Sequence, residues 1–470
     1  MFSDIMYREN EVRYVCMSIK KIVVELSNER LITPSGLTLV GAILGNSDLV
    51  NNVNNVSTTD RRSQPQIKNG DIILTYIGLL CQGKTAFESV REMEDDPEYY
   101  EMALGLVRGI PSAETLRLRM DEIGTSLREE ILNANTNMFV HYGISPTPLP
   151  IGYVPVDIDV TPFDNSKTSK EGVSRTYKGY DGYAPIMAYI GKEGFLANAE
   201  LRAGKQHCQN GTPEFLRETL TQCHKITEAP LLVRMDSGND AAVNIGILLE
   251  DEAKFIIKRN PRRGETPEGW YEEVRDSCKD IRNPREGKTV YLGTSSKDIT
   301  YKDSEGNSCK RSVSIVYEVI KRTIDKRGQI LLAPDIELNT WWTNLDQHYD
   351  EIISLYHAHG ESEQFHSEIK TDMDVERLPS GKFDTNALVL DLTILAYNIL
   401  RMMGQESLKK DDARKTKETV KRRRLRTVIA NLIQIAGHIT QHSRRVVLAL
   451  GRSNIWRHPF MRLYQRFVLA

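Results

Sequence analysis

The spacing of apolar and polar positions changes along the chain, and each change predicts a different kind of element. In residues 1–150, short amphipathic segments alternate with Gly and Pro turns, so this region is expected to be mostly helical. Ser112 is the expected N-cap of a helix that starts at Ala113. Residues 47–69 are polar and rich in Asn and Ser, which predicts a loop. A compact helical region of this kind suits DNA binding and a purely structural cap equally well.

From about Gly152 the pattern becomes one of strands that later alternate with helices. Strands are predicted over 153–160, 183–190, 194–201, 229–236 and 253–259, and helices over 213–225 and 240–250. Strands followed by alternating helix and strand are typical of an α/β domain, in which neighbouring strands end at the same edge of the sheet.

Residues 261–335 have a different pattern, with short β-prone segments separated by closely spaced turn residues. The predicted strands are GWYEEV, KTVYLGT, ITYKD, CKRSVSIVYEVI and GQILLAP. They predict a β-rich insertion within the α/β domain. IELNTWWTN returns to a core strand, and its Trp341 and Trp342 are expected to pack between the core and the insertion.

Helices are predicted for the rest of the chain. The first covers 356–370, a turn-rich connector follows at 371–383, and two more helices are expected at 384–403 and 415–450. The stretch Ala387 to Met403 is the most apolar of these. Asp391 and Asn398 interrupt it, so we expect a core helix and not a membrane span.

The composition is that of a soluble globular protein. The chain has 470 residues, of which 40% are hydrophobic and 27% charged, which is enough for two or three domains. The six cysteines are scattered without a CxxC pair, which indicates a reducing, cytoplasmic compartment. MFSDIMYREN is charged from the start and does not resemble a signal peptide. There is no Walker loop and no Rossmann glycine fingerprint.

The charge is distributed unevenly. The whole chain has a net charge of −2, yet residues 401–470 carry +13 and the first 400 residues therefore carry −15. A basic end of this kind indicates a polyanion-binding region. Its densest part comprises Lys421, Arg422, Arg423, Arg424 and Arg426. Such a run is either a solvated linker or a set of contacts to DNA phosphates.

Three carboxylates stand in positions that suggest a cation site. VPVDIDV at 154–160 places Asp157 and Asp159 on one side of a strand, and APLLVRMDSG ends a buried strand at Asp236. In YHAHGESEQFHSEIK, helical spacing places Glu363 on one face with the three side chains Tyr356, His359 and Lys370. Three carboxylates suit a hard cation, which prefers oxygen ligands.

Each of these residues also has a structural interpretation. Asp236 could simply cap its turn through Gly238, Tyr356 could be a packing residue and Lys370 an ordinary surface lysine. Asp157 could replace Asp159 as the ligand, because both lie on the same strand face. The combination favours a catalytic site.

In order and spacing, these motifs resemble a DDE-type transposase of a bacterial insertion sequence, and most closely the 1380 family, in the group that carries a β-strand insertion. The signature of that group is Tyr-x2-Arg-x3-Glu-x6-Lys, and Tyr356, His359, Glu363 and Lys370 occupy its four places, with His in place of Arg. Asp159-Val160-Thr161 matches the Asp-x-Thr of the first aspartate, and Asp236-Ser237-Gly238 matches the Asp-Ser-Gly of the second. The likeness covers nearly the whole chain.

The resemblance implies an α/β fold with a ribonuclease H-like catalytic core. The core would comprise residues 151–260 and 336–403, interrupted by the β-rich insertion at 261–335. Helical regions would flank it, with a DNA-binding region at 1–150 and a basic region at 404–470.

The resemblance also implies a catalytic site with two Mg²⁺ ions, for which Mn²⁺ can substitute. Asp159 would bind both ions, and Asp236 and Glu363 one each. Tyr356, His359 and Lys370 would contact phosphates.

The implied function is a transposase that cleaves DNA at transposon ends and transfers the strands into target DNA. Its partner would be double-stranded DNA, and pairing two ends predicts a homodimer in the bacterial cytoplasm or nucleoid. One alternative is a DNA-binding protein of transposase origin that no longer cuts. A metal-dependent phosphohydrolase of small molecules is disfavoured, because a small substrate needs neither the basic end nor the helical flanks.

Overall fold

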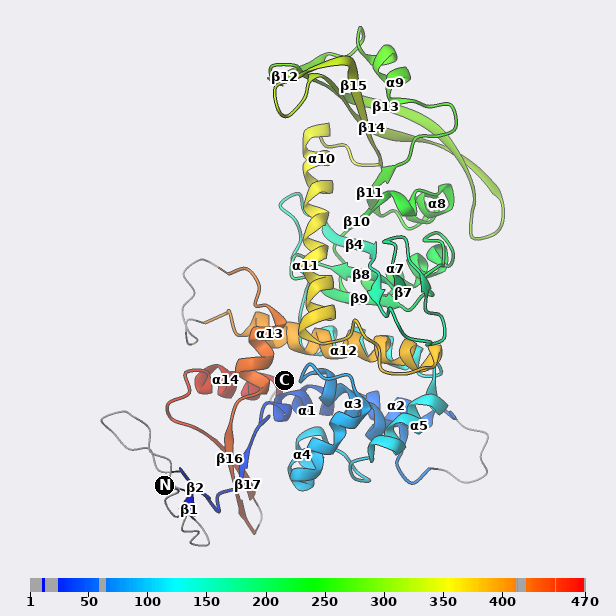
Figure 1. The fold of residues 1–470 in the computed structure, drawn as a ribbon. Helices are drawn as coiled ribbons and strands as arrows, with labels where there is room; N and C mark the ends of the chain where they lie inside the picture. The colour runs from blue at the N-terminus through cyan, green and yellow to red at the C-terminus, as the bar shows by residue number, and fades with distance from the viewer. Residues whose placement is uncertain are drawn as a thin grey trace, which may run out of the picture.

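The protein has a mixed α/β architecture built around a nine-stranded sheet (Figure 1). The computed structural model describes residues 11–12, 24–58, 65–410, 412, 420–443 and 445–468. Cys16, the segment MFSDIMYREN, part of the predicted loop and the start of the predicted helix at 415–450 lie outside the described residues.

The first 150 residues are mainly helical, as predicted. The helices are α1 (Leu37–Gly45), α2 (Leu49–Asn55), α3 (Asn69–Leu80), the 3-10 helix η1 (Phe87–Asp95), α4 (Pro97–Leu104), α5 (Ala113–Ile123) and α6 (Arg128–His141). Ser112 caps α5, because its hydroxyl accepts a hydrogen bond from the Thr115 N–H at 3.2 Å. The loop predicted at 47–69 is partly wrong: α2 forms there because Leu49 and Val53, one turn apart, are both buried.

The core of the sheet has the strand order β9-β8-β4-β10-β11. Its strands are β4 (Val154–Val160), β8 (Ile186–Ile190), β9 (Phe195–Glu200), β10 (Leu231–Met235) and β11 (Lys254–Arg259). Strands β4, β10 and β11 are parallel, whereas β8 and β9 are antiparallel additions at one edge. The connecting helices α7 (Thr212–Ile226) and α8 (Ala242–Glu250) lie where helices are predicted. The strand predicted at 183–190 is divided between β7 (Asp181–Tyr183) and β8.

The remaining short strands belong to separate small sheets. They are β1 (Glu11–Val12), β2 (Val24–Glu25), β3 (Leu31–Ile32), β5 (Phe163–Asp164) and β6 (Ser174–Arg175). Strands β5, β7 and β6 form a separate three-stranded sheet beside β4.

The β-rich segment is continuous with the core sheet. It contains α9 (Pro267–Val274), β12 (Asp280–Arg285), β13 (Lys288–Lys302), β14 (Ser308–Ile324) and β15 (Ile330–Thr343). The predicted strands KTVYLGT and ITYKD are parts of one strand, β13, and GQILLAP and IELNTWWTN are parts of β15. Because β15 pairs with both β14 and β11, Trp341 lies between core and insertion, as predicted.

The prediction of a strand at GWYEEV is wrong, because these residues form most of α9. The hydroxyl of Thr266 accepts a hydrogen bond from the Gly269 N–H at 3.0 Å, and Pro267 occupies the first helical position. An N-cap Thr followed by Pro starts a helix whatever the β-propensity of the aromatic residues that follow.

One sheet face is covered by an irregular helical run, yellow in Figure 1. It consists of α10 (Tyr349–His357), a 3-10 turn η3 (Ala358–Glu361), α11 (Ser362–Ser367) and a π-helical turn η4 (Glu368–Asp372). The predicted helix at 356–370 therefore exists, but not as one regular α-helix. Leu232, Ile256 and Trp341 of the sheet pack in one cluster with Ile352 of α10.

Helix α12 (Phe383–Glu406) is the core helix predicted for this region. Of the described residues, only this helix is long and apolar enough to cross a membrane, but 94% of its apolar window is buried inside the protein. It packs against α3, α6 and β9. Its interrupting polar residues are satisfied: Asp391 binds Arg128, and Asn398 donates to Asn135 at 2.7 Å.

The single helix predicted at 415–450 is wrong. The described part contains α13 (Leu425–Val428), a π-helical turn η5 (Ile429–Ile433), and the hairpin β16 (Gly437–His442) and β17 (Arg445–Leu450), followed by α14 (Arg457–Val468). Strand β16 also pairs with β3, which lies near the other end of the chain. A partner this distant in sequence is not visible in local periodicity.

Candidate active site

Two of the predicted carboxylates lie side by side at the ends of parallel strands. Strands β4 and β10 pair in parallel up to Ile158 and Met235, so the next positions, Asp159 and Asp236, are neighbours. Burial and the negative charge of Asp159 raise the pKa of Asp236 above its usual value. Two adjacent, half-buried carboxylates repel each other unless a cation lies between them.

Asp159 is oriented by contacts to both of its oxygens. Its Oδ1 accepts a hydrogen bond from the Val160 N–H at 2.8 Å, and its Oδ2 lies 3.3 Å from Nε2 of His366. Burial raises the pKa of Asp159, but His366, His359 and the Val160 N–H together lower it further, so the pKa lies below the usual value. The side chain is 24% exposed, so it is open to a ligand.

Asp236 caps its own turn through one oxygen. Oδ1 accepts hydrogen bonds from the Gly238 N–H at 3.1 Å and from Nδ2 of Asn239 at 2.8 Å. No hydrogen bond to Oδ2 is found among the described residues. The turn-capping role is therefore compatible with a second role for the other oxygen.

Asp157 differs from Asp159 because it is already neutralised. Arg234 donates to both of its oxygens, at 2.6 and 2.7 Å, and Nδ1 of His359 lies 3.0 Å from Oδ1. Burial raises the pKa of Asp157, but Arg234 and His359 lower it further than burial raises it. This buried ion pair makes Asp159 the better candidate for binding a cation.

His359 and Tyr356 lie beside the three aspartates, but His359 is buried and Tyr356 is partly buried. His359 is only 8% exposed; burial lowers its pKa, but Asp157 raises it above the usual value. The Tyr356 ring packs 5.8 Å from Trp341 and 6.2 Å from His359. Burial and the charges of Asp236 and Asp159 raise the pKa of Tyr356 to about 12.

Glu363, the third predicted carboxylate, is exposed on α11. Among the described residues, no group of three or more His, Cys, Asp or Glu side chains is close enough together to hold a metal ion. Within the same residues, neither Asp159 nor Asp236 forms an ion pair with a Lys or Arg. Two uncompensated carboxylates are the kind of oxygen ligand that a divalent cation prefers, whereas Glu363 is not joined to them in this structure.

Lys370 contacts the chain just beyond the end of β4. Its ammonium group donates to the carbonyl oxygen of Pro162 at 2.7 Å and lies 5.6 Å from the centre of the Phe163 ring. Burial lowers its pKa, and the nearby charge of Lys178 lowers it further. The ammonium is therefore partly desolvated and lies within electrostatic reach of Asp159.

Three members of the basic cluster are held by contacts within the fold. Arg422 binds Glu368 at 3.0 Å, and Arg424 donates to Asp372 at 2.8 and 3.0 Å. Arg423 is 8% exposed, and its guanidinium packs 4.9 Å from the centre of the Trp456 ring.

The two remaining members, Lys421 and Arg426, are exposed. The Arg426 side chain is 71% exposed and lies 3.6 Å from Asp372. Lys421 lines a cavity of about 370 Å³ together with Asp157, Arg234 and Glu361. A role in binding DNA phosphates stays a prediction for all five members. Arg424 is also exposed, with 47% of its side chain open, but it is held by Asp372, whereas Lys421 and Arg426 keep their charged ends more freely available.

Two residues near the aspartates are absent from the sequence-based prediction. His366 follows Glu363 by three residues, a spacing that places both on one helix face, so this signal was available. Tyr177 lies in an irregular polar segment that offers no such signal. Its ring is 68% exposed, while its hydroxyl donates to the carbonyl oxygen of Val160 at 3.1 Å. Burial of the hydroxyl end, together with the charges of Asp159 and Asp236, raises its pKa.

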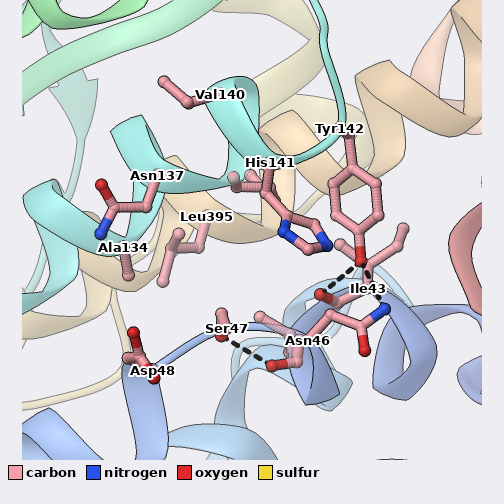
Figure 2. Close-up of a pocket in the computed structure, with 12 residues that line it drawn as sticks. Ile43, Asn46, Ser47, Asp48, Ala134, Asn137, Val140, His141, Tyr142 and Leu395 are labelled. Atoms are coloured by element: carbon pink, nitrogen blue, oxygen red, sulfur yellow. Dashed lines mark hydrogen bonds between the residues drawn. The ribbon is translucent and has the colours of Figure 1, made fainter. Parts of the chain in front are cut away.

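A second cavity, of about 280 Å³, lies among the N-terminal helices (Figure 2). Two of its polar side chains are bonded within the fold: the Tyr142 hydroxyl donates to the carbonyl oxygen of Ile43 at 3.0 Å, and Asn46 donates to that of Phe467 at 2.8 Å. Neither Asp159 nor Asp236 lines this cavity.

Comparisons with known proteins assign the chain to a family. A comparison with curated proteins finds no match. Among solved structures, the cryo-EM structure of the piggyBac transposase synaptic complex with hairpin DNA is similar at 12% identity and a TM-score of 0.37, over 93% of this chain and 81% of that chain. A similarity this low does not by itself establish a relationship. The model of the family described as Transposase DDE domain group 1 matches residues 16–469, and the chain therefore belongs to that family of DDE transposase domains.

Proposed function

We propose that this protein cleaves DNA strands at transposon ends and joins them to target DNA by metal-dependent phosphoryl transfer. The observation that carries the proposal is the pairing of Asp159 and Asp236 at adjacent parallel strand ends, without a compensating Lys or Arg among the described residues. The strand order β9-β8-β4-β10-β11 supports a ribonuclease H-like core. The Tyr356-His359-Glu363-Lys370 spacing supports membership of the 1380 family of insertion sequences.

Asp159 and Asp236 would hold the divalent cations, Mg²⁺ or Mn²⁺, with Glu363 as the third ligand. The bound cations would activate a water or 3′-hydroxyl and stabilise the leaving oxygen. Glu363 belongs to α11, the helix whose His366 already contacts Asp159. A change in its side-chain rotamer or in the short helix would be required to bring its carboxylate to the aspartates.

The DNA strand would be held by residues around the aspartates. Lys370 would contact a phosphate beside the scissile bond as a point charge, with Tyr356 close by. The exposed ring of Tyr177 would stack on a base, since its hydroxyl anchors it one residue from Asp159. Lys421 and Arg426 would contact phosphates farther along double-stranded DNA. Two transposon ends held together would require a homodimer, acting in the bacterial cytoplasm.

A DNA-binding protein that no longer cuts is the second candidate. Two observations favour it: Glu363 is not joined to the aspartates, and His359 is buried against Asp157 where the resembling group has Arg. This candidate retains the basic end and the fold but predicts no metal-dependent chemistry.

The decisive experiment is strand cleavage of DNA carrying the ends of the element, with Mg²⁺ or Mn²⁺. Wild type is compared with Asp159→Asn, Asp236→Asn and Glu363→Gln, while DNA binding is measured in parallel. Glu361→Gln is the matched control, because Glu361 is an exposed glutamate of the same helical run.

Metal-dependent cleavage that disappears in the three variants, but persists in the control with binding intact, supports the proposal. Binding without cleavage by the wild type would favour the second candidate. Glu363→Gln that cleaves like the wild type would remove Glu363 from the site.

A further inference from the structure

Two buried polar side chains, Tyr189 and His366, form a chain of contacts that ends at Asp159. Tyr189 of β8 is 1% exposed and His366 of α11 is 5% exposed. The Tyr189 hydroxyl lies 3.0 Å from Nδ1 of His366, and Nε2 of the same ring lies 3.3 Å from Oδ2 of Asp159. Nε2 has no well-aligned hydrogen-bond partner among the described residues, so it is a buried polar atom directed at the candidate cation site.

The contacts determine where the imidazole proton lies. If Nε2 carried a lone pair, it would face the negative oxygen of Asp159 at 3.3 Å, which is repulsive. A proton therefore lies on Nε2. In the neutral ring, Nδ1 then accepts from the Tyr189 hydroxyl, which lies 3.0 Å away and has the Met187 sulfur, at 3.3 Å, as a weaker alternative acceptor. The neutral tautomer that satisfies both contacts is the one with its proton on Nε2.

The position of His366 is set by packing as well as by hydrogen bonds. The neighbouring Phe365 ring lies 5.0 Å from the Tyr189 ring and fills the space above Gly194. Gly194 has a φ of +66°, and a Cβ there would come within 2.2 Å of the Phe365 ring. The turn between β8 and β9 thus allows α11 to approach the sheet closely enough for His366 to reach β4.

We propose that His366, with its tautomer set by Tyr189, is the positioning residue for Asp159. Its Nε2 lies against Oδ2 at 3.3 Å, an electrostatic contact, while the Val160 N–H donates a hydrogen bond to Oδ1, so both oxygens of the carboxylate are restrained in one orientation. Groups that orient a metal-binding side chain in this way typically contribute about 10- to 100-fold to metal affinity. The inference rests on the proposed function, because it assigns Asp159 to a cation.

The test measures Mn²⁺ binding to the full-length protein by the electron paramagnetic resonance signal of free Mn²⁺, and strand cleavage in parallel. We expect His366→Phe to weaken Mn²⁺ binding about 10- to 100-fold. His366→Gln should recover most of the affinity, because its amide N–H can still donate to Asp159. Tyr189→Phe should cause a smaller loss, since it removes only the group that selects the tautomer.

Phe365→Leu is the control for packing, because it loosens the same helix without removing a contact to Asp159. Thermal unfolding identifies any variant that fails to fold, and His366→Gln keeps the test valid if His366→Phe does. Wild-type affinity in His366→Phe, or an equal loss in Phe365→Leu, would overturn the inference while leaving the proposed function standing. If the wild type does not bind Mn²⁺, or if Asp159→Asn binds it equally well, both proposals fail.

Discussion

At the residue scale, His359 occupies the place of an arginine in the resembling transposase group, but its surroundings already contain a guanidinium. Arg234 binds both oxygens of Asp157, and His359 supplies the third contact to the same carboxylate. A phosphate contact by His359 stays a prediction. In this structure its ring instead completes a buried polar cluster next to Asp159.

We expect His359→Arg to destabilise the protein. A second guanidinium beside Arg234 would be buried with only one carboxylate between them, at a cost on the order of 2 kcal/mol or more in the free energy of unfolding. Chemical denaturation measures the change. His359→Gln is the control, since its amide can still donate to Asp157. An unchanged stability together with faster cleavage would instead assign His359 to the phosphate contact.

At the element scale, the π-helical turn η4 organises the basic segment that follows α12. Glu368 lies between Arg401 and Arg422, and Asp372 accepts hydrogen bonds from Arg424 and from the Arg426 N–H. Part of the positive charge is therefore neutralised inside the fold. The charge run is neither a solvated linker nor wholly available to DNA.

Removing the charge of Arg424, which binds Asp372, should affect stability differently from removing the charges of Lys421 and Arg426. Arg424→Gln should lower the free energy of unfolding by about 1–2 kcal/mol, because it removes hydrogen bonds to the buried carboxylate of Asp372. The double variant Lys421→Gln/Arg426→Gln should leave stability nearly unchanged. Chemical denaturation of the two variants measures the difference.

The same double variant should make the dependence of DNA affinity on salt less steep. The slope of log K against log salt should change by about 0.9 for each DNA phosphate that is no longer neutralised by a side chain. Fluorescence anisotropy at several salt concentrations measures the slope. A salt slope that changes in Arg424→Gln but not in the double variant would contradict the assignment of the DNA contacts to Lys421 and Arg426.

At the scale of the whole molecule, core and insertion share one sheet. Trp341 is paired on one side with Lys258 of β11 and on the other with Val316 of β14, and it is 1% exposed. The insertion is thus anchored, through β11, to the strands that end at Asp159 and Asp236 by a continuous ladder of backbone hydrogen bonds. Motion of the insertion relative to the aspartates would require breaking this ladder.

We expect Trp341→Ala to destabilise core and insertion together. Loss of a buried indole costs about 3–5 kcal/mol, and the sheet should still unfold in a single transition. Thermal unfolding followed by circular dichroism, with limited proteolysis of the insertion, tests both statements. Leu332→Ala is the control, because Leu332 is fully exposed on the same strand. Two separate transitions in the wild type would show that the insertion is an independent unit.

Local patterns were sufficient for the elements that depend on near neighbours. The strand at 154–160, the cap at Ser112 and the buried helix at 384–403 follow from alternation, capping chemistry and apolar periodicity, and the structure confirms them. The adjacency of Asp159 and Asp236 was predicted by the same reasoning, because parallel strands end at a common edge.

Features that depend on distant partners could not be predicted in this way. Strand β16 pairs with β3 near the other end of the chain, and Arg423 is buried because Trp456 covers it. The contact between His366 and Asp159 depends on how closely α11 packs on the sheet. Such partners are far apart in sequence, so the local spacing of apolar and polar residues does not reveal them. Their free energy comes from burial and hydrogen bonds that exist only once the chain has folded.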